Sequence, residues 1–162
     1  MLMRTILLLS ACTLLAACSD DDFEAPTFDR IQTATDPANG QTVEVILDEV
    51  IDPATDTADL DDGERYVAIV FSVKNTSDEP FTETDPSADA WLITDVSEDT
   101  IVPDLHEASD CEPFEEVPFG GANEPVPPGE TISGCVTFEI PAEAGLVSFG
   151  YYFGEPLTFD LS

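Results

Sequence analysis

The chain has 162 residues, with 35 Asp and Glu against 4 Lys and Arg, a formal net charge of −31 and a mean hydropathy of +0.00. This length allows one domain with a tail. A hydrophobic content of 43% is too high for a disordered acidic chain. So few cations exclude nucleic-acid binding that works by neutralising phosphates.

Residues 1–17 have the pattern of an export signal rather than of a folded element. Arg4 precedes an apolar stretch that is too short to span a bilayer comfortably. The stretch ends in Leu15-Ala16-Ala17-Cys18, which resembles the lipobox of bacterial lipoproteins. The resemblance implies cleavage before Cys18, acylation of its thiol, and a membrane-anchored, extracytoplasmic protein of the cell envelope. An ordinary secretory signal is the alternative.

Residues 18–39 lack a sustained hydrophobic period and include the run Asp20-Asp21-Asp22 as well as Pro26 and Pro37. This composition predicts an acidic, flexible tether. A solvated spacer whose charges repel one another explains the acidic run better than a metal site does.

From residue 40 to 162, strand patterns follow one another and helical patterns are absent. Thr131–Ile140 alternates cleanly, and Tyr66–Val73 is apolar on both faces, as expected of a central strand that is covered on both sides. Residues 42–50, 90–94, 146–153 and 157–161 also have strand patterns, and Trp91 and Ile93 share one face of theirs. The turn signals are Asp52-Pro53, Asp62-Gly63, Asp78-Glu79-Pro80, Pro127-Pro128-Gly129 and Gly154-Glu155-Pro156. We therefore predict an all-β fold, an antiparallel Ig-like β-sandwich of about six to eight strands.

Three segments of this domain carry a family resemblance. They are Gly40–Val45 with Val50–Pro53, Gly63–Ile69 with Val73–Pro80, and Pro128–Pro141. Together they resemble the Ig-like, telokin-like domain of unknown function found in lipoproteins of mostly Gram-positive bacteria, which is related to secreted immunoprotective antigens. The resemblance implies a fold and a cell-envelope setting, and it implies no activity. The chain departs from the family in its few lysines and in an acidic insert from Asp104 to Glu124.

The four cysteines separate by position. Cys12 lies in the signal and Cys18 in the lipobox-like sequence, which leaves Cys111 and Cys135. Two cysteines in an exported domain predict a disulfide. Because Cys135 lies on the polar face of its strand, this bridge is expected outside the core, where it would hold the intervening loop against the sheet. The rival, a nucleophilic pair of a cysteine with His106, would require a free thiolate.

Catalytic and metal-binding motifs are missing from the sequence. With His106 as the single histidine and no cysteine cluster, zinc and copper sites of histidine or thiolate cannot be built. No nucleophile elbow, P-loop or dinucleotide fingerprint occurs. We therefore expect no enzyme activity and no cofactor.

Calcium is the stronger chemical hypothesis. Six carboxylates fall between two predicted strands, and hard oxygen ligands suit Ca²⁺. They belong to Asp52, Asp56, Asp59, Asp61, Asp62 and Glu64. Their spacing is not that of an EF-hand, and acidic residues are spread over the whole chain. Weak calcium binding, or a structural domain that depends on calcium or salt, therefore stays the alternative to the main interpretation.

The remaining feature is the run of aromatic residues on one strand, for which two interpretations stay open. Phe149, Tyr151 and Phe153 are expected in the core, with Tyr152 on the surface. An aromatic patch on the outer sheet face would be able to anchor a protein or glycan partner. We therefore expect a lipid-anchored, non-catalytic binding module, and a partner steered to it electrostatically would have to be basic.

Overall fold

The computed structural model describes residues 30–55, 60, 62–81, 88–103 and 125–162. These residues form eight strands and no helix, so the part of the chain that is described holds no helix able to cross a membrane. The strands are β1 (Ile31–Thr35), β2 (Thr42–Ala54), β3 (Glu64–Asn75), β4 (Ala90–Thr94), β5 (Ser97–Ile101), β6 (Thr131–Pro141), β7 (Leu146–Phe153) and β8 (Glu155–Asp160).

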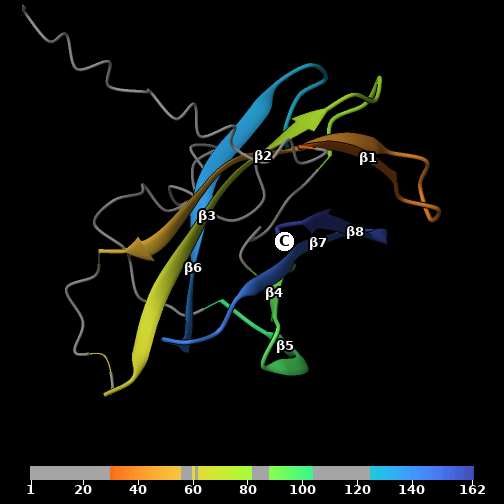
Figure 1. Ribbon diagram of the computed structural model, residues 1–162. Helices are drawn as coiled ribbons and strands as arrows, with labels where there is room; N and C mark the ends of the chain where they lie inside the picture. Colours follow the sequence, from red (N-terminus) through yellow and green to blue (C-terminus); the bar gives the residue numbers. More distant parts are fainter. Residues whose placement is uncertain (1–29, 56–59, 61, 82–87, 104–124) are drawn as a thin grey trace, which may run out of the picture.

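The strands form two four-stranded antiparallel sheets. One has the order β1-β2-β3-β6 and the other the order β5-β4-β7-β8. The sheets lie face to face, with the shorter strands of the second sheet across the long strands of the first (Figure 1). The predicted antiparallel β-sandwich is thereby confirmed.

The core lies between the two sheets and is rich in aromatic rings. Phe71 of β3 lies 5.2 Å from Phe149 and 5.3 Å from Tyr151, measured between ring centroids. Phe149 also stacks on Phe159 of β8 at 5.9 Å. All four side chains are fully buried. Offset and tilted ring pairs at these separations add to the free energy gained by burying apolar area.

The long strand β3 is buried on both faces, as its sequence predicts. Val67, Ile69, Phe71 and Val73 join the core between the sheets. The opposite face carries a second, smaller apolar cluster of Ala54, Tyr66, Ala68 and Cys135, with Ile51 and Val70 packed against it.

The position of Cys135 follows from the same alternation. Cys135 belongs to the second cluster rather than to the core between the sheets, so its side chain lies on the predicted face of β6. Cys135 is disulfide-bonded. Cys111 lies outside the described residues, and the pairing of the two cysteines stays a prediction.

The start of the sandwich corrects the predicted domain boundary. The tether was expected to end at residue 39, but residues 31–35 form β1, which pairs with β2 from Ile31↔Ile46 to Thr35↔Thr42. The sequence pattern did not indicate this strand because Ala34 is its one fully buried residue, while Ile31 is 52% exposed. A strand whose inward face is Gln32 and Ala34 has no hydrophobic alternation to detect.

Two further details differ from the sequence prediction. The expected turn at Asp52-Pro53 is a cis peptide bond within β2, where the register with β3 is irregular between Ile51 and Ala54. Strand β5 was not predicted, because Ser97-Glu98-Asp99-Thr100-Ile101 is almost entirely polar. It is an edge strand of its sheet, and polar edge strands discourage pairing with other chains.

The sheets are joined along one side by side-chain hydrogen bonds between β1 and β8. The Gln32 side-chain amide donates to the Thr158 carbonyl, and its oxygen accepts from the Thr158 amide at 3.3 Å. The Thr35 amide donates to Glu155 Oε1 at 3.1 Å. Strand β8 would otherwise have an unpaired backbone edge here, and these bonds satisfy part of it.

Candidate binding face

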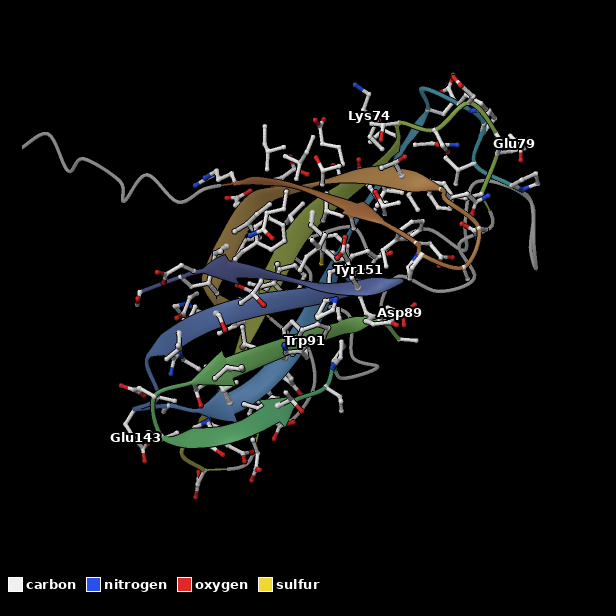
Figure 2. The ribbon with its side chains drawn as sticks, turned by 90° about the vertical axis from the view of Figure 1, so that its right-hand side faces the viewer. Lys74, Glu79, Asp89, Trp91, Glu143 and Tyr151 are labelled. Atoms are coloured by element: carbon white, nitrogen blue, oxygen red, sulfur yellow. The ribbon has the colours of Figure 1, made fainter. Side chains whose placement is uncertain are left out.

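The outward side of β4 and β7 carries the partly exposed aromatic residues of this sheet. On β4, Ala90, Leu92 and Thr94 are buried, whereas Trp91 and Ile93 are half-buried on the opposite side. On β7, Phe149 and Tyr151 are fully buried, whereas Tyr152 is 48% exposed. We call the surface made by Trp91, Ile93 and Tyr152 the aromatic face. It belongs to the sheet seen in front in Figure 2.

The Trp91 side chain packs over Gly150. The two residues are cross-strand partners. A Cβ atom added to Gly150 would lie 1.9 Å from Cε2, 2.2 Å from Cζ2 and 2.3 Å from Nε1 of the indole. The ring therefore lies directly over the glycine, against the backbone of β7. This contact holds the indole against the sheet, and the Trp91 side chain is half-buried.

Tyr152 and Asp89 lie at the same end of this face. The Tyr152 amide donates to the Asp89 carbonyl at 2.9 Å, which continues the β4–β7 pairing by one residue. The Tyr152 hydroxyl donates to the Gly154 carbonyl at 3.1 Å, so the ring is anchored at its tip. Asp89 precedes Trp91 by two residues, and Figure 2 shows the two at the start of β4.

The electrostatic character of this sheet is purely acidic. The strands β4, β5, β7 and β8 contain no Lys or Arg; the four cations of the chain are Arg4, Arg30, Arg65 and Lys74. Asp160, at the end of β8, accepts hydrogen bonds from the amide and hydroxyl of Ser162, and these lower the pKa of its carboxyl. Asp160 therefore stays ionised at neutral pH.

Arg65, in β3 of the other sheet, makes all its side-chain hydrogen bonds to β2 and to the end of β6 and the turn after it. Its Nε and Nη2 donate to the two carboxylate oxygens of Asp52 at 2.7 and 3.0 Å. The remaining three N–H groups donate to the carbonyls of Pro141, Ala142 and Ala144 at 2.7–2.8 Å. All five guanidinium donors are thus satisfied. The hydrogen bonds to Asp52 raise the pKa of Arg65 above its usual value.

This arrangement bears on the calcium hypothesis. Asp52, one of its six carboxylates, is held by Arg65 on both oxygens. Asp56, Asp59 and Asp61 lie outside the described residues. Among the residues that are described, no group of three or more His, Cys, Asp or Glu side chains is arranged to hold a metal ion.

A polar hollow of about 320 Å³ lies between the β1–β2 turn and the turn at residues 76–79. Buried Asn75 organises the second turn: its Nδ2 donates to the carbonyls of Glu79 and Val126, and its Oδ1 accepts from the Ser77 amide and hydroxyl. The polar groups at this hollow serve the turns, so it is a weaker candidate than the aromatic face.

The aromatic residues of β7 that the sequence pointed to can now be placed. Phe149 and Tyr151 are in the core, Phe153 is half-buried beside it, and Tyr152 is on the surface. What the sequence prediction missed is the neighbour of Tyr152, since the pairing of Trp91 with Gly150 depends on the register of two distant strands. Cys18, His106 and Cys111 lie outside the described residues.

No protein-family model matches the chain, and no curated protein matches it. Among solved structures, the chain is similar to the crystal structure of YcdA from Bacillus subtilis, a protein provisionally classed as a lipoprotein, with a TM-score of 0.57 and 14% sequence identity. The similarity covers 82% of this chain and 38% of YcdA, so the chain spans well under half of that neighbour's length. At this identity the similarity establishes a shared β-sandwich fold.

Proposed function

We propose that this chain is a lipid-anchored, extracytoplasmic interaction module that binds a partner at the cell envelope without catalysing a reaction. The lipobox-like Leu15-Ala16-Ala17-Cys18 supports the anchor. The shared fold with YcdA, itself provisionally classed as a lipoprotein, and the resemblance to the telokin-like domain of lipoproteins favour the same setting. Acyl chains would hold the protein on a membrane although its acidic surface is repelled by anionic lipid.

The aromatic face is the observation that carries the binding role. Trp91, Ile93 and Tyr152 form an adjoining aromatic and apolar surface on the outside of one sheet, and the sandwich leaves Tyr152 half exposed. Tryptophan and tyrosine on a rigid support are the side chains that contribute most to protein interfaces. The absence of recognisable catalytic motifs in the sequence favours binding rather than catalysis.

Cell fractionation tests the anchor. The full chain is expected in the membrane fraction, and Cys18→Ser should move it to the soluble fraction because the acylated thiol is lost. Cys12→Ser is the matched control, since this cysteine would leave with the signal and its replacement should change nothing. A Cys18→Ser variant that still sediments with membranes would show that the anchor is not this thiol.

Site-specific crosslinking tests the binding face. Tyr152 is replaced by p-benzoylphenylalanine in the native envelope, and irradiation should give a discrete adduct. The same photoreactive residue at Val102, which is 71% exposed and lies beyond the end of β5, serves as control and should give none. Equal products at the two positions, or none at Tyr152, would contradict an interface at the aromatic face.

A further inference from the structure

We propose that β1 is a strap that opens while the rest of the sandwich stays folded, and that its opening exposes a proteolytic site at which the domain is released from its anchor. β1 lies along one side of the sandwich, between the edge of β2 and β8 (Figure 1). The release rests on the proposed lipid anchor, whereas the opening of β1 does not.

β1 buries far less than the edge strand beside it. Ala34 is the one fully buried residue of β1, and Ile31 is 52% exposed. β8, an edge strand of similar length, and the residue that follows it contribute Leu157, Phe159 and Leu161 to the core. Burial of a leucine or phenylalanine side chain stabilises a strand much more than burial of an alanine does. The core therefore holds β8 in place but holds β1 only weakly.

Hydrogen bonds are what keep β1 closed. It pairs with β2 along all five of its residues. On its other side, Gln32 bonds to the backbone of Thr158, and the Thr35 amide donates to Glu155. When a strand opens, water replaces such bonds at a small net cost for each. β1 therefore opens locally, at a free energy well below that of global unfolding.

The position of β1 in the chain gives this opening a consequence. The predicted tether precedes β1, and every residue of the core between the sheets except Ala34 follows it. A protease binds its substrate as an isolated extended segment, so β1 has to leave β2 before it is cut. An endoprotease would then hydrolyse one peptide bond of the open segment: water adds across this bond and leaves a carboxylate on one fragment and an ammonium group on the other. The sandwich would keep its core and lose its link to the anchor.

Trypsin is a clean probe of this opening, because the sequence offers it just four cleavage sites: Arg4, Arg30, Arg65 and Lys74. Arg30 directly precedes β1, and its carbonyl accepts from the Leu47 amide at 2.8 Å, so cleavage after Arg30 requires the start of β1 to open. Arg65 and Lys74 lie in the central strand β3, so cleavage there requires global unfolding. The full chain in a non-ionic detergent is digested, and the fragments are identified by their intact masses.

We expect cleavage after Arg30 to be on the order of 100-fold faster than after Arg65 or Lys74, because the rate follows the population of the open form. Urea at about 1 M should speed cleavage in β3 strongly and cleavage after Arg30 little, since local opening exposes little surface. An unstructured peptide substrate corrects for the effect of urea on trypsin. If trypsin cuts after Arg30 no faster than in β3, then β1 opens only with the whole sandwich and the proposal is wrong.

A disulfide that locks β1 onto β2 provides the control. Ile31→Cys with Ile46→Cys is suitable, because these cross-strand partners flank the hydrogen-bonded pair of Arg30 and Leu47 and are themselves a non-hydrogen-bonded pair. The oxidised variant should be cut after Arg30 at least about tenfold more slowly than the reduced one. Wild-type chain in the same reductant controls for the native disulfide of Cys135. Undiminished cleavage in the oxidised variant would show that Arg30 is accessible without any opening of β1.

Two substitutions within β1 test what keeps it closed. Gln32→Ala should speed cleavage after Arg30 about fivefold, as expected for the loss of about one net hydrogen bond. Thr33→Ala changes the next, exposed residue and should speed it less than about twofold. Equal effects would contradict a strap that is held by its hydrogen bonds to β8.

The release is tested on membranes from cells that carry the full chain. Trypsin should move a fragment of residues 31–162, uncut at Arg65, into the soluble fraction. A fragment that is cut after Arg30 but stays on the membranes would overturn the release and leave the opening of β1 intact. Fractionation of Cys18→Ser tests the anchor, and digestion in detergent tests the strap, so the two can fail separately.

Discussion

Arg65 shows how much structure one side chain can organise. Its five donors join Asp52 in β2 to one carbonyl at the end of β6 and two in the turn that follows it. The planar guanidinium matches the carboxylate with two parallel hydrogen bonds, which the ammonium of a lysine cannot do. The cost of making an ion pair is small here, since both side chains keep some contact with water, 19% and 27% exposed.

We therefore expect Arg65→Ala to lower the free energy of unfolding by about 2–3 kcal/mol, because it leaves three carbonyls and a carboxylate without their donor. Urea denaturation followed by Trp91 fluorescence measures the change. Lys74→Ala removes the same charge and should cost less than about 0.5 kcal/mol. Similar losses in the two variants would mean that net charge, rather than the hydrogen-bond network, is responsible.

The second prediction at this scale concerns Gly150. A methyl group there would overlap the Trp91 indole, with 1.9 Å between the new Cβ and Cε2. Gly150→Ala should displace the ring, shift its emission and cost about 1–3 kcal/mol of stability. In a Trp91→Ala background the same substitution should cost less than about 1 kcal/mol, as a double-mutant cycle would show. An undiminished cost would place the clash in the backbone rather than in the ring.

At the scale of elements, side-chain hydrogen bonds between β1 and β8 join the two sheets along one side. The side-chain amide of Gln32 pairs with the backbone N–H and C=O of Thr158, as the backbone of a neighbouring strand would. The glutamine therefore acts as a short extension of the backbone ladder across the side of the sandwich. Without it, the backbone N–H and C=O of Thr158 would be unpaired at the edge of β8.

Gln32→Glu tests this role, because glutamate has the same shape but cannot donate to the Thr158 carbonyl. We expect a loss of about 1–2 kcal/mol and faster hydrogen exchange of the amides in β1 and β8, measured by mass spectrometry or NMR. Gln41→Glu makes the same substitution in the β1–β2 turn and should leave β8 protected. If β8 exchanges equally fast in both, the hydrogen bonds of Gln32 do not secure this side.

The elements also differ in how far the sequence could predict them. β3, β6 and β7 carry strong apolar patterns because each contributes several core residues, and alternation is the trace of burial on one face. β1 and β5 lie at sheet edges and contribute little to the core. Their strand state comes from hydrogen bonds to β2 and β4, which a local pattern cannot reveal.

At the scale of the whole molecule, self-repulsion is the dominant electrostatic term. A net charge of −31 on 162 residues opposes the compact state, and dissolved salt screens it. Within the described residues, the ion pair of Arg65 with Asp52 neutralises very little of this charge. The apolar core between the sheets therefore has to offset the repulsion between the acidic side chains.

We expect the melting temperature of the full chain to rise with ionic strength, and NaCl, MgCl₂ and CaCl₂ at matched ionic strength to raise it by similar amounts. Differential scanning calorimetry in a non-ionic detergent provides the measurement. A rise that only CaCl₂ produces at low millimolar concentration would instead indicate a specific site. Such a result would favour the calcium-dependent structural domain over the binding module.

The sequence by itself determined the all-β class, the central position of residues 66–73 and the assignment of Phe149 and Tyr151 to the core. These features are local, because burial on one face of a strand leaves a hydrophobic period of two. Only the tertiary structure decided that β1 belongs to the domain, that Gln32 joins the sheets, and that Trp91 rests on Gly150 beside Tyr152. Each of these depends on the register between strands far apart in the chain, which the packing of the whole sandwich sets.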